Sequence, residues 1–334
     1  MRFGIIGSGS WATAIAKILT DNGNTVNWWV RNNDTISYIE KRRHNPHYLS
    51  STYFNNAQLQ LSSDIQAVVT GSDVLVIAVP SAYVESSLEA LSPQQLRNKK
   101  IVSAVKGILP SGNRLLNDYL SEAFSFPLES YFTLLGPCHA EEVAAEKLSY
   151  LTFSGQQPEA TAAIAAHFKT DYLNTVVNTD VLGVQYAAVL KNIYALGAGI
   201  AHGLEYGDNF LSVYIANSAN EMEIFLQQSN DKGPFAEQSH NYAASVYLGD
   251  LLVTCYSLYS RNRTFGNMIG KGYSVKAAQL ELNMIAEGYN ASKCIFTMNH
   301  SIHAAIPIAT AIYEILWEQV PAAQGFKKIE SLLR

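Results

Sequence analysis

Cysteine is scarce in this chain, and the cysteines present are not spaced for a zinc site or a disulfide framework. Cys138, Cys255 and Cys294 lie far apart and form no CxxC pair. This pattern favours a reducing compartment. His300 and His303 form an HxxH. No third histidine or acidic ligand is evident nearby in the sequence, so we expect no metal site.

The chain also lacks an excess of basic residues and a long uninterrupted apolar run. Its 23 Lys and Arg against 28 Asp and Glu give a formal net charge of -5, which argues against non-specific nucleic-acid binding. The most apolar long stretch, 184–200, has Lys191 and Asn192 at its middle, so we expect no stable membrane insertion. Met1 opens directly into an apolar strand pattern without a basic leader, so we expect a cytoplasmic protein.

What the chain does contain is enough apolar sequence for two domains of different kinds. It has 334 residues, of which 48% are hydrophobic. In the first half, short β-branched runs alternate with helical patterns, which predicts a parallel sheet with right-handed crossovers. The expected strands are 3–6, 25–30, 74–79, 101–105 and 132–135. After about residue 180, helical patterns dominate, at 180–202, 209–228, 275–280, 288–299 and 304–318. We therefore predict an α/β domain over 1–180 and a mostly α-helical domain over 181–334.

A glycine-rich loop follows the first expected strand and opens a helix. Residues 7–12, Gly-Ser-Gly-Ser-Trp-Ala, match GxGxxG/A. Gly7 permits a tight turn, Gly9 lets the backbone approach a pyrophosphate, and Ala12 allows close packing of helix on sheet. The helix N-terminus offers N–H groups to the phosphates. Because strand, loop, helix and second strand all occur, we predict dinucleotide binding rather than an ordinary glycine-rich turn.

The end of the second expected strand bears on the choice between NAD and NADP. An acidic residue there would bind the ribose 2′-hydroxyl, whereas an arginine can accept a 2′-phosphate. This chain has Arg31 there, with Asp34 three residues on. We expect NADPH or NADH, with NADPH favoured. The alternative for Arg31 is a solvated loop cation.

Lys191 falls on the apolar face of its expected helix. Val184, Ala187, Ala188, Ala195 and Ala198 share that face at helical spacing. A buried lysine needs a partner, a lowered pKa or a function, although a lysine snorkelling at the rim of the core is the alternative. A cationic acid is what a carbonyl reduction needs to protonate the developing alkoxide. Asp250 is a candidate partner, or else a capping or turn aspartate.

A polar cluster, Ser260-Arg261-Asn262-Arg263, stands out in the apolar second half. Arginine binds phosphate in a planar fork, and Ser and Asn add neutral donors. The cluster is a candidate site for a phosphorylated substrate, with an exposed turn as the alternative.

With these residues in place, the chain strongly resembles bacterial soluble NAD(P)-dependent glycerol-3-phosphate dehydrogenases along nearly its whole length. The motifs that carry the resemblance are GSGSWATA at 7–14, VPS at 79–81, VKG at 105–107, GPCHAEEVA at 136–144, LKNIYALGAGIAHGLEYGDN at 190–209, LGDLLVTC at 248–255, SRNR at 260–263 and AEGY at 286–289.

The resemblance implies a Rossmann-type N-terminal domain, an α-helical C-terminal domain and an active site between them. It implies reduction of dihydroxyacetone phosphate to sn-glycerol 3-phosphate for phospholipid synthesis, and it makes a homodimer plausible. Lys191 would be the proton donor, supported by Asn192, Asp250 and Thr254. The substrate-phosphate site would hold Ser260, Arg261 and Asn262, and Lys106 would touch both ligands. The remaining substrate contacts would be Gly136 and Cys138. The dinucleotide contacts would include Gly7, Gly9, Ser10, Trp11, Arg31, Ala140, Arg261 and Glu287.

Two residues depart from the family pattern. Cys138 stands where many members carry Thr or Ser, and a thiol is a weaker donor than a hydroxyl. His202 stands where relatives often have an acid. Two other functions remain open: a related dehydrogenase acting on an unphosphorylated hydroxy acid or opine, and a dinucleotide-binding sensor that has lost catalysis. The cluster at 260–262 speaks against the first, and the joint presence of Lys106, Lys191, Asp250 and Arg261 against the second.

Overall fold

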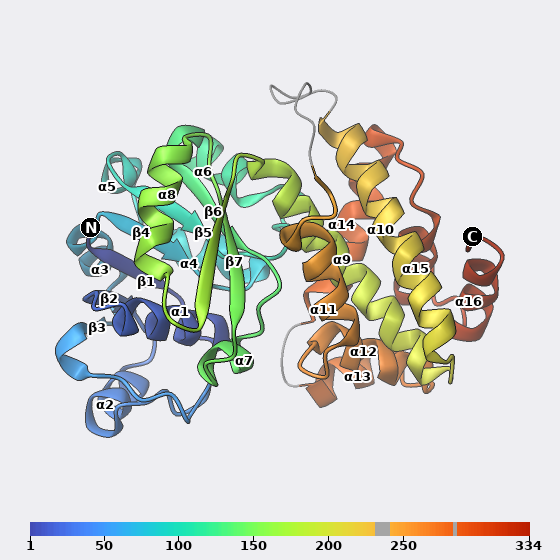
Figure 1. Cartoon of the computed structure of the whole chain (residues 1–334), viewed down its shortest axis with the longest axis horizontal. Coiled ribbons are helices and arrows are strands. Elements are labelled where there is room, and N and C mark those ends of the chain that lie inside the picture. The colour runs from blue at the N-terminus through green and yellow to red at the C-terminus, as the bar shows by residue number, and fades with distance from the viewer. Residues whose placement is uncertain (231–240, 283–285) are drawn as a thin grey trace. The chain divides into compact units, whose positions relative to one another are not determined.

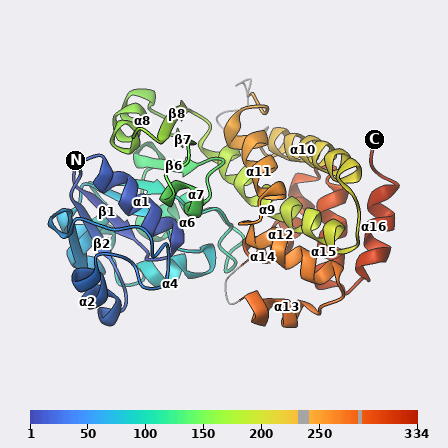
Figure 2. The same ribbon diagram turned by 60° about the horizontal axis from the view of Figure 1, so that its bottom comes forward.

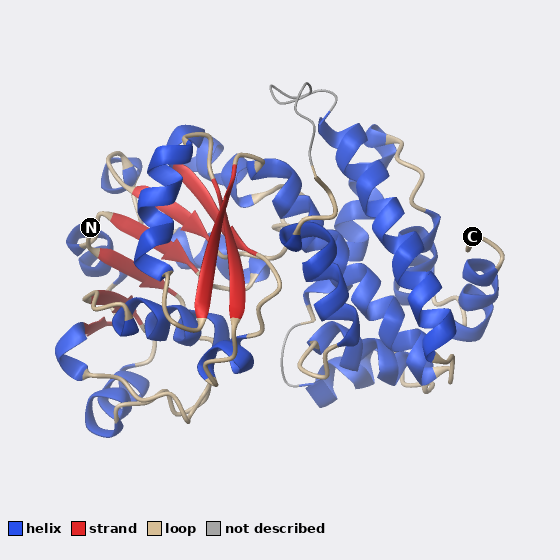
Figure 3. Cartoon of the chain, viewed as in Figure 1, coloured by secondary structure: helices blue, strands red, loops and turns tan. Residues whose placement is uncertain are grey.

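The computed structural model describes residues 1–230, 241–282 and 286–334. The chain divides into two compact units, one made of residues 1–105 and 114–181 and the other of 106–113 and 182–334 (Figure 1). In the described part of the chain, every strand lies in the first unit and the second unit is helical (Figure 3). The segment that carries Lys106 belongs, by its contacts, with the helical unit.

The first unit is built on one eight-stranded sheet of order β3-β2-β1-β4-β5-β6-β7-β8. Its strands are β1 (Phe3–Ile6), β2 (Val26–Trp29), β3 (Leu59–Ser62), β4 (Val74–Ile77), β5 (Lys100–Ser103), β6 (Tyr131–Leu135), β7 (Ser149–Ser154) and β8 (Leu173–Asn178). All neighbouring strands pair parallel except β6 and β7. The expected α/β class is confirmed, and the sheet predicted as parallel is parallel except at this one pair. The strand order reverses between the neighbouring strands β1 and β4, and open α/β sheets bind ligands at such a point.

Three strands, β3, β7 and β8, were not expected from the sequence. β3 is a half-buried run of alternating apolar and polar residues. In β8, Val176 and Val177 are 42% and 40% exposed. β7 mixes serine, tyrosine and threonine with two apolar residues. None of the three forms the continuous apolar run that marks a central parallel strand.

Helices cover both faces of this sheet and complete its core. They are α1 (Ser10–Asp21), α2 (Asn33–Arg42), α3 (Ile65–Gly71), α4 (Val84–Leu88), α5 (Pro93–Leu96), α6 (Leu116–Phe124), α7 (Ala140–Ala144) and α8 (Pro158–Ala165). Ile15, Ile18 and Leu19 of α1 pack with alternate residues of the strands, such as Phe3 and Trp28, in one fully buried cluster. That cluster fixes α1, and so the loop before it, on the sheet.

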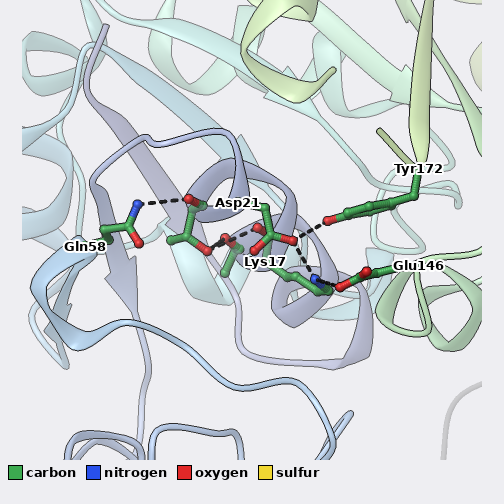
Figure 4. Close-up of polar contacts among 7 residues, drawn as sticks. Lys17, Asp21, Gln58, Glu146 and Tyr172 are labelled. Carbon is green, nitrogen blue, oxygen red and sulfur yellow. Dashed lines mark hydrogen bonds and ion pairs between the residues drawn. The ribbon is translucent and has the colours of Figure 1, made fainter. Parts of the chain in front are cut away.

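Lys17 ties α1 to the segment that follows α7. Its Nζ lies 2.5 Å from Asp21 and 2.9 Å from Glu146, and it faces the Tyr172 ring (Figure 4). The Tyr172 hydroxyl donates to Asp21 at 2.6 Å. Burial alone would lower the pKa of Lys17, but the two carboxylates raise it. The cluster therefore keeps a nearly buried cation charged and holds α1 in place.

The second unit is a set of packed helices. They are α9 (Val181–Gly203), α10 (Asp208–Asn230), α11 (Asp250–Tyr256), α12 (Arg261–Gly270), α13 (Val275–Leu282), α14 (Glu287–Ile302), α15 (Pro307–Trp317) and α16 (Ala322–Glu330), with a π-helical turn, η5 (Ser245–Gly249), before α11. The expected helical character is confirmed. α11, α12 and α16 were not expected as helices. Among the described residues, no helix is long and apolar enough to cross a membrane.

α9 runs through the helical unit (Figures 1 and 2) and is buried on nearly all sides from Val181 to Ala201. The sequence pattern predicted one buried face for this helix, whereas the structure buries nearly its whole surface. α9 meets α12 backbone to backbone: a Cβ on Gly266 would lie 1.9 Å from the Leu196 carbonyl oxygen, and one on Gly199 would lie 2.0 Å from the Arg263 carbonyl oxygen. This close approach brings the start of α12 to the middle of α9.

Candidate active site

In the first unit, the glycine loop forms a tight turn and leaves open space at the start of α1. Gly7 adopts φ +122°, and a Cβ there would lie 2.5 Å from the Ala78 carbonyl oxygen, so only glycine fits. Gly9 is the N-cap of α1, and the space where its Cβ would stand is open. The open space and the N-terminal amides of α1 fit a phosphate group.

Two side chains that the sequence did not single out hold this loop. Trp28 of β2 donates from Nε1 to the Gly7 carbonyl oxygen at 2.6 Å. Asn45 is fully buried and donates to the Ser8 carbonyl oxygen at 3.1 Å and to Thr13 Oγ1 at 2.9 Å. Both contacts join residues far apart in sequence, so no local pattern reveals them.

The other residues named for the cofactor in this unit stand near the ends of strands. Ser10 and Trp11 open α1, and Ala140 opens α7, which packs against α1. Arg31 is exposed just after β2, where Asn32 caps α2 by accepting from the Asp34 and Thr35 amides. An exposed Arg31 is available to a ligand, and its role stays a prediction.

Gly136 and Cys138 lie in the turn after β6. Gly136 adopts φ +126°, and Cys138 donates through Sγ to the Tyr150 carbonyl oxygen at 3.2 Å. The thiol is buried, with 6% exposure. This hydrogen bond to β7 fixes the turn that contains both Gly136 and Cys138.

In the second unit, Lys191 and Asp250 form a buried ion pair between α9 and α11. The side chains are 4% and 2% exposed, and Lys191 Nζ donates to Asp250 Oδ1. Asp250 Oδ2 is buried and has no hydrogen-bond partner among the described residues. Asp250 is the first residue of α11 and faces inward, so it does not act as a cap or a turn residue. A buried acceptor oxygen without a donor calls for a bound group that supplies one.

A chain of amide contacts runs beside this pair. Asn192 donates to the Lys106 carbonyl oxygen at 3.0 Å and accepts from Asn262 Nδ2 at 2.9 Å. Asn262 Oδ1 in turn accepts from the Gly288 amide at 2.9 Å. A Cβ on Gly288 would lie 2.4 Å from the Asn192 carbonyl oxygen. These contacts join α9, α12, the segment at 106 and the start of α14, whose first residue is Glu287.

The cluster at 260–263 is the start of a helix rather than an exposed turn. Ser260 caps α12 by accepting from the Arg263 amide at 3.3 Å, and Ser260 and Asn262 are buried. Arg261 is partly exposed at the first helical position. The α12 N-terminus, whose first helical residue is Arg261, is a suitable place for an anion.

Cys255 of α11 is close enough to Lys191 for the lysine to affect its pKa, but it is not a reactive thiol. Burial raises the pKa of Cys255 to about 12, although Lys191 and Arg263 oppose the rise. Cys255 is therefore a thiol and not a nucleophile at neutral pH. Thr254 donates to the Asp250 carbonyl oxygen at 2.6 Å, which orients its side chain along α11. In the described part of the chain, no group of three or more His, Cys, Asp or Glu side chains is placed to hold a metal ion.

The residues named from the sequence thus fall into two groups, one in each unit. The helical unit brings together Lys106, Lys191, Asn192, Asp250, Thr254, Ser260, Arg261, Asn262 and Glu287. The first unit carries Gly7, Gly9, Ser10, Trp11, Arg31, Gly136, Cys138 and Ala140.

Comparison with known proteins accounts for both units. The N-terminal family of NAD-dependent glycerol-3-phosphate dehydrogenase matches residues 2–161, and the corresponding C-terminal family matches residues 180–327. The chain is 33% identical over 327 residues to the glycerol-3-phosphate dehydrogenase [NAD(P)+] of Chlorobium luteolum, covering 97% of this chain and 96% of the relative. It is 30% identical to that of Lacticaseibacillus paracasei, covering 96% and 92%.

Solved structures agree with this assignment. The crystal structure of the Coxiella burnetii glycerol-3-phosphate dehydrogenase matches with a TM-score of 0.88 at 25% identity and covers 100% of this chain and 99% of that one. The Saccharomyces cerevisiae enzyme shares the fold, with a TM-score of 0.80 at 24% identity and coverage of 99% of both chains. The chain therefore belongs to the NAD-dependent glycerol-3-phosphate dehydrogenase family.

Proposed function

We propose that the chain interconverts dihydroxyacetone phosphate and sn-glycerol 3-phosphate, with NADPH or NADH as the cofactor and Lys191 as the acid and base. The observation that carries this proposal is the buried Lys191–Asp250 pair, whose second carboxylate oxygen lacks a donor among the described residues. A hydroxyl of the substrate supplies such a donor. The relatives named above support the reaction.

The buried pair is suited to acid–base chemistry at a carbonyl group. A dinucleotide held by the glycine loop would supply the hydride to the carbonyl carbon. Lys191 Nζ gives a proton to the carbonyl oxygen as negative charge develops there, and it takes the proton back in the reverse direction. Such proton transfer contributes about 10²–10⁴-fold to the rate. Asp250 holds the Lys191 ammonium in one place.

The substrate phosphate is assigned to the start of α12. Ser260, Arg261 and Asn262 stand there with the helix N-terminal amides, and Arg261 supplies the charge. Asn192 and Asn262 fix each other through their amides. We assign further substrate contacts to Lys106, Thr254, Cys138 and the Gly136 backbone.

The dinucleotide is assigned to the glycine loop of the first unit. Gly7, Gly9, Ser10 and Trp11 would receive the pyrophosphate, and Arg31 would accept a 2′-phosphate, so NADPH is favoured over NADH. Lys106, Ala140, Arg261 and Glu287 complete the proposed cofactor contacts.

The cellular setting is proposed from family resemblance alone. We propose that the chain works in the cytoplasm, that its product feeds phospholipid synthesis, and that it forms a homodimer.

The test is the loss of NADPH absorbance, and separately of NADH absorbance, when purified protein meets dihydroxyacetone phosphate. We expect rapid oxidation, faster with NADPH, and a large loss of rate with unphosphorylated dihydroxyacetone. Arg31→Ala should remove the preference for NADPH. Faster reaction with an unphosphorylated hydroxy acid or keto acid would instead assign another dehydrogenase activity. Folded, cofactor-bound protein with no oxidation would indicate a sensor.

A further inference from the structure

Glu221 is a buried carboxylate of the helical unit that lies outside the proposed machinery. It sits on α10 with 4% exposure. Its oxygens accept from the Ile308 amide at 2.6 Å, the Ala309 amide at 3.2 Å and the Tyr194 hydroxyl at 3.3 Å. One side chain thus joins α10 to α15 and to α9.

Part of this arrangement serves the start of α15. Pro307 is the first residue of that helix, and Ile306, its N-cap, makes no side-chain cap. The Ile308 and Ala309 amides therefore need an acceptor from elsewhere, and Glu221 supplies it. A cap for α15 does not by itself explain why Glu221 also meets Tyr194.

The contact with Tyr194 reaches the helix turn that carries Lys191. Tyr194 is three residues after Lys191 on α9, so the two belong to one turn. α10 holds Tyr194 twice, because the Tyr214 hydroxyl also donates to the Tyr194 carbonyl oxygen at 3.0 Å. Tyr194 and Tyr214 are both fully buried. The turn from 191 to 194 is therefore clamped by α10 at Tyr194 and by Asp250 of α11 at Lys191.

We propose that Glu221 is a positioning residue for the reaction: through Tyr194 it fixes the turn of α9 that holds Lys191 Nζ against Asp250. This inference rests on the proposed role of Lys191. The groups that face the Glu221 carboxyl are Tyr194 of α9, Tyr214 of α10 and the α15 amides. Cys255 of α11 helps to raise the pKa of Tyr214. Burial makes the carboxyl costly to keep in this place, which indicates that its contacts matter.

Two single variants and their double variant test the link. Glu221→Gln keeps the shape but removes the charge, and Tyr194→Phe removes only the hydroxyl that meets Glu221. We expect each to lower kcat about tenfold or more, since small misplacement of a reacting group is costly. KM for dihydroxyacetone phosphate should change little, because the phosphate is held elsewhere. The kcat of the double variant should fall no further than that of the lower single variant, because both substitutions act on kcat through the one contact between Glu221 and Tyr194.

Glu223→Gln is the matched control on the same helix, since Glu223 accepts from Gln227 on the helix surface and should leave kcat unchanged. Wild-type protein that fails to oxidise NADPH would overturn the proposed function itself. With active wild type, unchanged kcat in either single variant overturns the positioning role. A rise in KM that matches the fall in kcat, or additive losses in the double variant, overturns it as well.

Discussion

At the scale of the residue, the helical unit buries Lys191, Asp250 and Glu221, and their surroundings differ. Lys191 meets an opposite charge in Asp250, so its burial is compensated. Within the described part of the chain, the donors to the Glu221 carboxylate are neutral. Burial raises the pKa of Glu221 to about 7, although all three donors oppose the rise. Glu221 therefore titrates close to neutral pH.

This titration predicts a pH dependence of stability. Below pH 4.5, the ordinary pKa, Glu221 is protonated in the folded and unfolded chains and costs nothing. As the pH rises to about 7, the unfolded carboxyl ionises first, so the free energy of unfolding falls, by up to about 3 kcal/mol. Urea unfolding at pH 5 and pH 7.5 measures the fall. Glu221→Gln should lose this contribution, and an unchanged difference between the two pH values would contradict the assignment.

The sequence revealed Lys191 but not its setting. An apolar stretch interrupted by a lysine is visible in one segment of chain, whereas Asp250 lies 59 residues away. The partner was named only as a candidate, because no local pattern encodes which aspartate reaches a given lysine. Trp28 and Asn45 were missed for the same reason.

At the scale of the element, the packing of α9 on α12 sets the candidate site. The two helices touch through glycines, which lets Asn262 reach Asn192. Close helix approach of this kind leaves no room for a side chain.

Gly266→Ala tests this packing. The added Cβ would meet the Leu196 carbonyl oxygen, a backbone atom that cannot turn away. We expect a loss of at least about 1–3 kcal/mol of stability, with a fall in turnover as α12 shifts. The thermal midpoint and kcat measure both effects.

Gly207→Ala is the control, since nothing lies within 4 Å of its Cβ position. It should lower stability by no more than about 1 kcal/mol, because Gly207 precedes α10 as its N-cap and alanine is less favourable there than glycine. Equal effects of the two substitutions would contradict a close α9–α12 contact.

Elements with strong patterns were predicted well, and those decided by packing were not. The long helix α9 was expected at 180–202 and spans Val181–Gly203. α12 was missed because its first residues are polar and charged, as in a turn. Its helical state depends on its glycine contacts with α9, which a single segment does not display.

At the scale of the whole molecule, the candidate site residues are divided between the two units. The sheet unit carries the glycine loop, and the helical unit carries the ion pair and the amide network. The class of each unit followed from the change of pattern near residue 180. The membership of 106–113 in the helical unit did not, because it depends on contacts with distant helices, including that of Asn192 with the Lys106 carbonyl oxygen.

The most direct test of the account is the turnover of Lys191→Ala and Lys191→Arg, measured beside NADPH binding in the same folded preparations. Arginine keeps the charge opposite Asp250 but does not release a proton near neutral pH. Both variants should bind NADPH as the wild type does, and kcat should fall by at least about 10²-fold. Turnover close to that of the wild type in either variant would contradict the assignment of Lys191 as the acid and base.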